Sequence, residues 1–382
     1  MRKVRNVGRS DHSATAEHTT EPLCRSSSPR SSPSRNSAMS AADTLYALAF
    51  SPDGSHLVGA TSRGLLLIWK LASSAATGAS TTALALAPPT LAAKLQAHTS
   101  TIYSLAFAPG DMLITGSDEE MRGWRWSQLL AGTVAPLFEL RNPTHALRRG
   151  GVGPLPETNA LAVDAAAGLL YSASGDGNAY AWDLKTHSRV RAYEGHTDLL
   201  HCLALCPQRR QLFSGSEDGS LRLWDVRAHK CAQVLRPHAP PLCPPGGEKA
   251  PSSGGWCACA AVDADENWLV AGWGDGFLCS VELSTLSCLA CLPTAAPPQA
   301  LCFEAGAGAA VLSVGAEAAL YRWKLTGECA TRATTSSPSV WALATHATAA
   351  DGAPLVATAG ASAALDLFVD PSHRAIAVPI DV

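Results

Sequence analysis

One stretch of sequence decides the fold of this chain: Gln211-Leu212-Phe213-Ser214-Gly215-Ser216-Glu217-Asp218-Gly219-Ser220-Leu221-Arg222-Leu223-Trp224-Asp225. An alternating apolar segment runs into a tight turn at Asp218. A second alternating segment follows and reaches Trp224, six residues after that turn residue. Alternation with a period of two predicts short strands, and the Asp-Gly turn between them predicts an antiparallel hairpin.

The spacing of six residues between a turn residue and an apolar anchor recurs along the chain. The other pairs are Arg63 and Trp69, Asp118 and Trp124, Asp176 and Trp182, Asp275 and Val281, Glu317 and Trp323, and Ser362 and Phe368. The seven anchors lie 55, 58, 42, 57, 42 and 45 residues apart. A period of roughly 40 to 45 residues is that of WD repeats. We therefore predict an all-β fold, a seven-bladed WD-repeat β-propeller over residues 41–382, with insertions where the spacing is longer.

Four polar or aromatic residues of the fourth copy predict a structural network. Asp218 can accept a hydrogen bond from His196, His196 can meet the Ser214 hydroxyl, and that hydroxyl can accept from the Trp224 indole. Ser, His and Asp also form hydrolase triads, but their spacing here fits the WD repeat better. No glycine-rich phosphate loop or catalytic carboxylate pair stands out. We expect no enzymatic activity, no catalytic residue and no cofactor.

Composition is consistent with a large soluble domain. The chain has 382 residues, of which 47% are hydrophobic and 16% charged, and no uninterrupted apolar run is long enough to span a membrane. Twelve cysteines include the local pairs Cys257-Ala258-Cys259 and Cys288-Leu289-Ala290-Cys291. Zinc ribbons need two Cys-x-x-Cys knuckles. We therefore expect buried thiols in a reducing compartment and no metal site.

The first 40 residues differ from the rest. Residues 1–40 are rich in Ser and Arg and have few large apolar residues, which predicts a disordered tail. Seven basic and three acidic residues give the tail a charge of +4, so the total of -3 leaves -7 on residues 41–382. Three interpretations stay open. The tail holds proline-directed phosphorylation sites at Ser28-Pro29 and Ser32-Pro33, it is a transit peptide, or it is a dispensable extension before Met39.

Three insertions are predicted between the regular strands, over residues 72–93, 127–156 and 236–255. The first is rich in Ala, Ser and Thr, and the third is rich in Pro, so both are expected to be surface loops. The second mixes apolar and basic residues in a way that suits a partner. Its candidate contact residues are Phe138, Leu140, Arg141, Arg148 and Arg149.

Several runs carry a resemblance to a known family. They include Leu95-Gln96-Ala97-His98, the double tryptophan of Arg122-Gly123-Trp124-Arg125-Trp126, Pro156-Glu157-Thr158-Asn159-Ala160-Leu161, Ser214-Gly215-Ser216-Glu217-Asp218-Gly219, and Tyr321-Arg322-Trp323-Lys324-Leu325-Thr326-Gly327-Glu328. In this order and spacing they are similar to the THO complex subunit 6 family of WD-repeat proteins, over roughly residues 45 to 382. The tail and the Ala-rich insertion depart from that family's pattern.

The resemblance implies a non-enzymatic scaffold in the nucleus. Such a subunit of the THO and transcription-export assembly would support the packaging of mRNA into mRNP and its export. Its implied partners are other THO subunits, in particular a coiled-coil pair beside the propeller. The acidic charge of residues 41–382 suggests that any contact of the folded part with nucleic acid is at most indirect.

A short motif points to a second class of function. Trp224-Asp225-Val226-Arg227 fits the Trp-Asp-x-Arg box by which some propellers resemble substrate receptors of cullin-RING ubiquitin ligases. In that interpretation Arg227 meets the ligase adaptor. The alternative is ordinary blade geometry with a solvated Arg227, and the two functions are compatible.

The ends of the repeat array predict how the ring closes. Residues 45–50 read as the inner strand of the first blade, and residues 374–380 read as the outer strand of the last. No strand would then be exchanged between the two ends, and packing between sheets would seal the ring.

Overall fold

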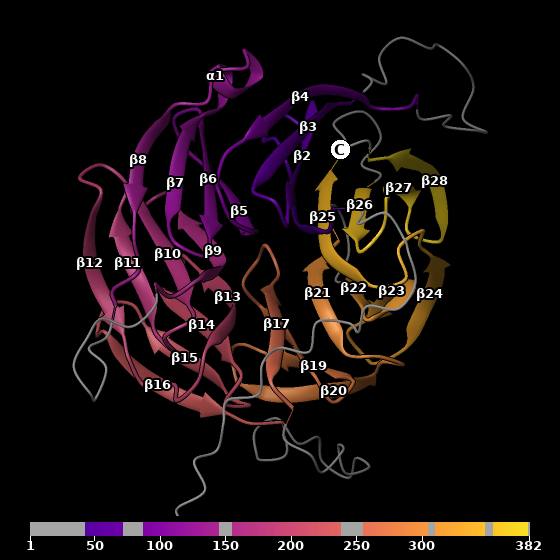
Figure 1. Ribbon diagram of the computed structural model, residues 1–382. Helices are drawn as coiled ribbons and strands as arrows, with labels where there is room; N and C mark the ends of the chain where they lie inside the picture. Colours follow the sequence, from indigo (N-terminus) through magenta and orange to yellow (C-terminus); the bar gives the residue numbers. More distant parts are fainter. Residues whose placement is uncertain are drawn as a thin grey trace, which may run out of the picture. The chain divides into compact units, whose positions relative to one another are not determined.

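Seven four-stranded sheets surround a common centre in the computed structural model of the chain (Figure 1). The structure describes residues 43–71, 87–144, 155–237, 255–304, 310–347 and 354–380. The predicted tail, the candidates Arg148 and Arg149, and residues 238–254 of the third insertion lie outside these ranges. Each sheet consists of four consecutive antiparallel strands. The seven-bladed propeller is therefore confirmed.

The first four blades follow one another around the ring. Blade one comprises β1 (Leu45–Phe50), β2 (His56–Thr61), β3 (Leu65–Lys70) and β4 (Thr90–Gln96). Blade two comprises β5 (Ile102–Ala108), β6 (Met112–Ser117), β7 (Met121–Arg125) and β8 (Pro136–Leu140), with helix α1 (Trp126–Leu130) before β8. Blade three comprises β9 (Thr158–Asp164), β10 (Leu169–Ser174), β11 (Ala179–Asp183) and β12 (Ser188–Tyr193). Blade four comprises β13 (Leu200–Cys206), β14 (Gln211–Ser216), β15 (Leu221–Asp225) and β16 (Lys230–Leu235).

The remaining three blades complete the ring. Blade five comprises β17 (Cys257–Val262), β18 (Trp268–Trp273), β19 (Phe277–Glu282) and β20 (Ser287–Pro293). Blade six comprises β21 (Pro298–Phe303), β22 (Ala310–Gly315), β23 (Glu317–Lys324) and β24 (Cys329–Thr334). Blade seven comprises β25 (Val340–Ala347), β26 (Pro354–Gly360), β27 (Ala364–Asp370) and β28 (His373–Pro379).

Burial follows the position of a strand within its blade. In β14 every residue after Gln211 is buried, because the second strand has sheet neighbours on both sides and a neighbouring blade on each face. The outer strand β12 is exposed over its first four residues. All seven predicted anchors lie on the third strand of their blades and are buried. The alternation that predicted the strands is therefore the alternation between the two faces of each blade.

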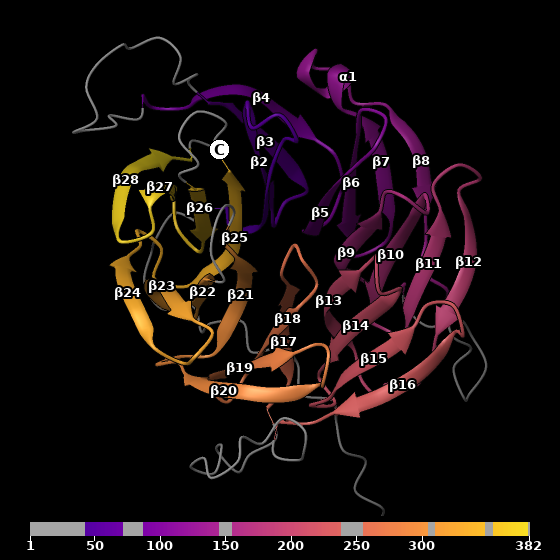
Figure 2. The same cartoon turned by 180° about the vertical axis from the view of Figure 1, so that it is seen from behind.

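Hydrophobic seams between neighbouring blades form the core. The described residues contain seven such clusters, one for each pair of adjacent blades. The seam between blades seven and one joins Leu45 and Trp69 to Leu355 and Leu365, and β25 contacts β1. Figure 2 shows blade seven beside blade one. Among the described residues, every sheet consists of four consecutive strands, so blades one and seven exchange no strand there. For this part of the chain, the predicted closure by packing between the first and last sheets is confirmed.

Blade four contains a continuous chain of hydrogen bonds. The Trp224 indole donates to the Ser214 hydroxyl at 2.8 Å, and that hydroxyl lies 2.8 Å from Nε2 of His196. Nδ1 of His196 lies 2.9 Å from the Asp218 carboxylate. An indole N–H can only donate, so the Ser214 oxygen accepts from it, and an ionised carboxylate can only accept, so Nδ1 of His196 donates to Asp218. Ser214 is thus occupied on both sides within the core and is not a free nucleophile.

Other blades retain parts of this network. In blade two, Thr115 accepts from the Trp124 indole at 3.0 Å and lies 2.6 Å from Nε2 of His98. In blade three, Trp182 donates to Ser172, and in blade six Trp323 donates to Ser313. A hydroxyl on the second strand therefore satisfies the buried indole in each of these blades.

Two of the predicted insertions are shorter than expected. The loop predicted over residues 72–93 ends before Thr90, where β4 begins. The insertion predicted over residues 127–156 contains most of α1 and all of β8, so it includes the outer strand of blade two. Within the described residues, no helix is long and apolar enough to cross a membrane.

Replacing Asp218 by alanine tests the blade-four network. Burial raises the pKa of Asp218, but hydrogen bonds from His196 and Ser220 outweigh burial and hold that pKa well below its usual range. We expect Asp218→Ala to lower the free energy of unfolding by roughly 1 to 3 kcal/mol at neutral pH. The depressed pKa means that this contribution is present at neutral pH and is lost as the pH falls below about 4.

The measurement is denaturant unfolding at pH 7 and at progressively lower pH. Asp265→Ala is the matched control, since Asp265 is exposed. Equal stability of the Asp218 variant and the wild type at pH 7 would refute the role of Asp218 in the network.

His98 predicts a second pH dependence of stability. Burial, together with the charge of Arg122, lowers the pKa of His98 from 6.5 to about 3. The unfolded chain therefore binds a proton that the folded chain rejects, and stability is lost as the pH falls below about 6.5. At about 1.4 kcal/mol per pH unit, protonation of His98 in the unfolded chain should lower the free energy of unfolding by roughly 1 to 2 kcal/mol between pH 6.5 and 5. His98→Gln should remove this slope in urea titrations, whereas the same change at the exposed His229 should leave it.

Candidate functional site

The second tryptophan of the double-tryptophan run bridges two blades. Trp124, on β7, is buried in the core of blade two, whereas Trp126 begins α1 and is only partly buried. The Trp126 ring meets Phe107 of blade two at 5.2 Å and His56 of blade one at 5.7 Å between ring centroids. Both contacts are nearly perpendicular, the arrangement that aromatic rings prefer. Trp126 therefore fixes the start of α1 over the junction of blades one and two.

Asp111 holds the start of α1 from a neighbouring turn. This residue lies between β5 and β6 with a φ of 63°. Its carboxylate accepts hydrogen bonds from the backbone N–H of Ser127 at 3.2 Å and from the Ser127 hydroxyl at 2.5 Å. Its carbonyl oxygen accepts from the Trp126 N–H at 2.8 Å. The first orphan N–H groups of α1 are thus satisfied, although Arg125 at the N-cap makes no side-chain bond.

A shallow cavity of about 340 Å³ opens beside Trp126. Its walls are largely apolar and include Phe107, Met112 and Trp126, and Asp53 and Asp111 are also among its lining residues. Hydrogen bonds from the Ser51 and Ser55 hydroxyls lower the pKa of Asp53 to about 2. The cavity therefore combines an aromatic wall with negative charge at neutral pH, which suits an apolar side chain next to a cationic one.

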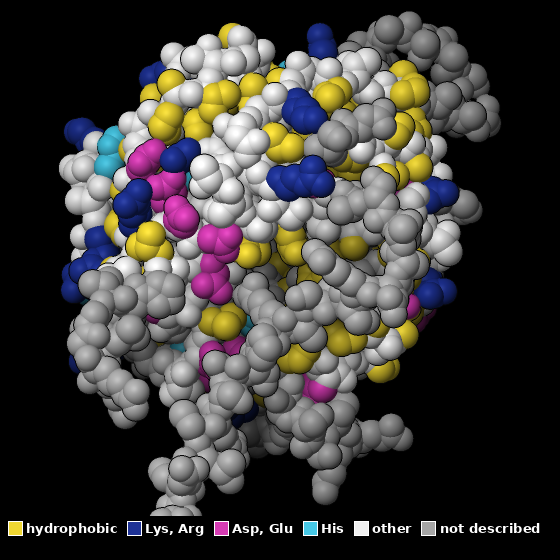
Figure 3. Space-filling model, viewed as in Figure 1, with side chains coloured by type: hydrophobic (Ala, Val, Ile, Leu, Met, Phe, Trp, Pro, Cys, Tyr) yellow, Lys and Arg dark blue, Asp and Glu magenta, His cyan; other side chains and the backbone are white. Residues whose placement is uncertain are grey.

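Exposed large hydrophobic residues gather at the outer rim of the same two blades. Among the described residues, seven such side chains are exposed, and four of them lie on β4, on α1 or on the segment from α1 through β8. These four, named here the rim patch, are Leu91, Leu130, Val134 and Leu137. β4 contacts α1, and Figure 3 shows hydrophobic side chains along the rim near α1. Clustered exposed apolar side chains are typical of a protein–protein contact surface.

The structure changes the assignment of the predicted contact residues. Phe138 and Leu140 belong to β8 rather than to a loop, and they are 7% and 5% exposed. The Phe138 ring stacks on His187 of blade three, and a Cβ atom at Gly123 would overlap it. Both side chains pack into the seam between blades two and three and are not available at the surface. Their placement on an insertion was wrong.

Arg141 is engaged by a buried carboxylate. Its guanidinium lies 3.1 Å from Glu120, which also pairs with Arg122. Glu120 is only 6% exposed, so two arginines compensate its burial. Arg141 thus fixes the start of the segment that follows β8, and its side chain is more than half exposed.

Sequence reasoning missed Leu130, Val134 and Leu137. The signal was present in Pro136-Leu137-Phe138-Glu139-Leu140, where exposed and buried side chains alternate from Leu137 to Leu140. Reading this run as a strand assigns Phe138 and Leu140 to the core and Leu137 to the outside.

The Trp-Asp-x-Arg box has ordinary turn geometry with an exposed arginine. Trp224 is buried, and the Asp225 carboxylate accepts from the N–H groups of Arg227 at 2.7 Å and Ala228 at 2.9 Å. These bonds lower the pKa of Asp225. Asp183 makes the same bonds to Lys185 and Thr186 in blade three, so this turn alone does not mark a special site. The side chain of Arg227 is exposed between β15 and β16.

Comparison with known proteins extends these observations. The family model described as WD domain, G-beta repeat, matches residues 89–125 and 187–225. The THO complex subunit 6 of Arabidopsis thaliana is 30% identical over 265 residues, which cover 66% of this chain and 68% of that protein. The THO complex subunit 6 of Homo sapiens and its homolog of Mus musculus are each 29% identical over 337 residues, covering 88% of this chain and 92% of each relative.

A pair of adjacent residues on β8 tests the division between core and surface. We expect Phe138→Ala to lower the free energy of unfolding by roughly 3 to 5 kcal/mol, because it leaves a cavity in a blade seam. Leu137→Ala removes a side chain that is 39% exposed and should change stability by less than about 0.5 kcal/mol. Denaturant unfolding of the two variants measures both values. Similar losses in the two would contradict the register of β8.

Proposed function

Because the chain belongs to the THO complex subunit 6 family, we propose that it is a non-enzymatic scaffold subunit of a THO complex in the nucleus. In this role it supports the packaging of mRNA into mRNP and its export. The observation that carries the proposal is the likeness to the human THO complex subunit 6, which extends over 92% of that protein. On the side of this chain, the likeness extends over 88% of the residues.

The rim patch is the proposed contact surface for a coiled-coil THO subunit. Leu130, Val134 and Leu137 present apolar surface on α1, the loop after it and β8. The outer face of a coiled coil carries charged side chains beside apolar ones. Asp53 and Asp111, which line the cavity beside Trp126, offer negative charge to Lys or Arg of such a helix.

The charge distribution supports protein partners over nucleic acid. Residues 41–382 carry a formal charge of -7, from the total of -3 and the +4 of residues 1–40. Several described arginines are paired with carboxylates, among them Arg122 with Glu120, Arg322 with Glu304 and Arg374 with Asp366. Arginines held in this way contribute little positive potential for phosphate binding.

Affinity purification of the tagged full-length chain from nuclear extract tests both the complex and the surface. We expect wild type to recover THO subunits. The combined variant Leu130→Glu, Val134→Glu and Leu137→Glu should recover at least about tenfold less, since charges would replace three apolar interface contacts worth roughly 1.4 kcal/mol or more in total.

The matched control replaces Val190 and Val234 by Glu. These residues are 48% and 40% exposed on the outer strands of blades three and four. They should leave recovery unchanged. If wild type recovers no THO subunit, the proposed complex is wrong. If wild type recovers THO subunits and the rim variant does so equally, only the proposed surface is wrong.

A second candidate function rests on the exposure of Arg227. An arginine side chain free on the turn after the third strand of blade four is accessible to a cullin-RING ligase adaptor. The same purification tests this function. It is favoured if wild type recovers the adaptor and the Arg227→Ala variant loses the adaptor but retains the THO subunits. Absence of any cullin or adaptor from the wild-type sample argues against it.

A further inference from the structure

Three cysteines of blade five converge at one place. Cys279 lies on β19, directly opposite Cys291 on the neighbouring strand β20. Between Ser280 and Val281 the register shifts, so that Ala290 faces Ser280 and Cys288 faces Val281. Leu289 is the extra residue of this bulge and is 46% exposed. The bulge turns Cys288 to the face that carries Cys279 and Cys291.

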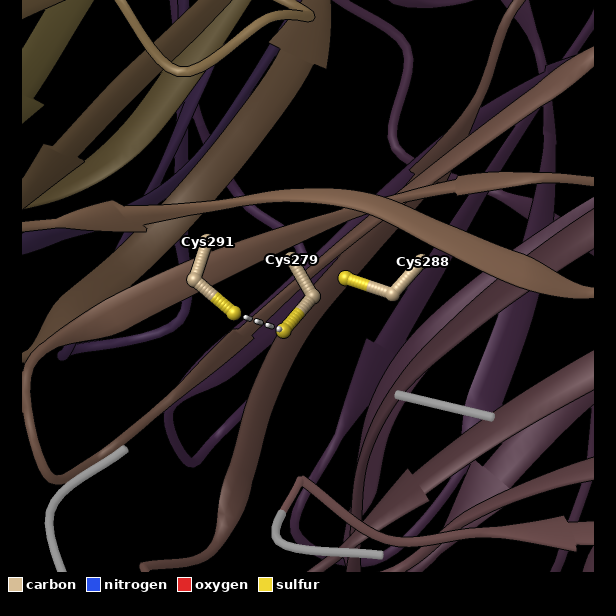
Figure 4. A group of neighbouring side chains, drawn as sticks. All are labelled: Cys279, Cys288 and Cys291. Atoms are coloured by element: carbon tan, nitrogen blue, oxygen red, sulfur yellow. Dashed lines mark hydrogen bonds between the residues drawn. The ribbon is translucent and has the colours of Figure 1, made fainter. Parts of the chain in front are cut away.

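The three thiols approach one another closely. Their Sγ atoms all lie within 4.8 Å of one another, and those of Cys279 and Cys291 are 3.5 Å apart. Figure 4 shows the three side chains pointing toward a common centre from the two strands. Cys279 and Cys288 are buried, whereas Cys291 is partly buried. Among the described residues, these three cysteines are the group of metal-ligating side chains whose donor atoms lie this close together.

The spacing of the sulfur atoms fits a thiolate-bound metal ion. A Zn–S bond is about 2.3 Å long, so two thiolates on one tetrahedral ion are separated by roughly 3.8 Å. Sulfur atoms within 4.8 Å of one another reach that separation by small side-chain rotations. We propose that Cys279, Cys288 and Cys291 bind a divalent thiophilic ion of the Zn²⁺ class, with water in the fourth position on the side of Cys291.

Charge favours a divalent ion over a monovalent one. Three thiolates carry three negative charges, so Zn²⁺ leaves a net charge of -1 and Cu⁺ leaves -2 in a largely apolar seam. Hydrogen bonds with Cys288 and Cys291, together with burial, raise the pKa of Cys279. A thiol loses its proton when it binds a metal ion as a thiolate. Binding breaks three S–H bonds, forms three metal–sulfur bonds and releases three protons to solvent.

The position of the site gives it a structural role. Cys279 and Cys288 belong to the seam between blades four and five. In blade five the anchor position holds Val281 instead of tryptophan, and Cys288 lies opposite this residue. A bound ion would tie the fourth strand β20 to the third strand β19, whereas the indole hydrogen bond of other blades ties the third strand to the second. We expect the ion to raise the stability of this seam.

Cadmium binding to the full-length chain tests the site. The reduced protein is stripped of metal with a chelator and titrated with Cd²⁺, and the ultraviolet thiolate-to-metal charge-transfer band is followed. We expect one tight equivalent. Each of Cys279→Ser, Cys288→Ser and Cys291→Ser should raise the Kd at least about 100-fold, since loss of a ligand exceeds the 10- to 100-fold effect of an outer contact. The buried Cys206 and Cys259 lie outside the cluster, so Cys206→Ser and Cys259→Ser should bind as wild type does.

A second measurement does not depend on the folding of any variant. Zn²⁺ should slow the alkylation of Cys291 in the wild-type chain and leave that of the exposed Cys329 unchanged. The proposal is overturned if cluster and control variants bind Cd²⁺ equally, or if Zn²⁺ fails to protect Cys291. A site that takes Cu⁺ but neither Zn²⁺ nor Cd²⁺ contradicts the divalent assignment. A Cys279–Cys291 disulfide in the reduced preparation contradicts the metal site.

Discussion

Burial between neighbouring sheets is the constraint on which the rest of this structure depends. A four-stranded blade has two apolar faces and cannot bury either by itself, so each blade needs a neighbour on both sides. The seam of Leu45 and Trp69 against Leu355 and Leu365 closes the ring, and it does so without sharing a strand. Fully burying a side chain such as Leu contributes roughly 1.5 to 3 kcal/mol. The closing seam is built of many such residues, so hydrophobic packing can replace a strand exchange.

The polar networks are secondary to these seams. Only blade four, among the described residues, links an indole, a hydroxyl, an imidazole and a turn carboxylate in one chain of hydrogen bonds. Blade two uses Thr115 and His98, and blade three uses Ser172 with Asn142, yet both form regular four-stranded sheets. Satisfying the buried indole is therefore the shared requirement, and the carboxylate adds stability to one blade.

Local periodicity predicted the strands well where the local pattern agrees with the packing between blades. The spacing of six residues between turn and anchor located the third strand of every blade, because the hairpin geometry is encoded within a few residues. The ends of the array also predicted closure correctly. The prediction failed between Ser127 and Leu140. A short helix held by Asp111 from another turn interrupts the pattern there, and no local signal reports that distant contact.

The Cys279, Cys288 and Cys291 cluster shows a second limit of sequence reasoning. Cys288 and Cys291 are three positions apart, with two residues between them, and regular alternation would place them on opposite faces of a strand. The bulge at Leu289 reverses this, and a bulge depends on cross-strand pairing that the sequence does not state. The rim patch and the thiol cluster therefore have a common origin. In both, an irregularity accompanies the outer strand of a blade: α1 precedes β8, and the bulge at Leu289 interrupts β20. Each irregularity changes which side chains are exposed or lie close together, while the hydrophobic seams between blades are kept.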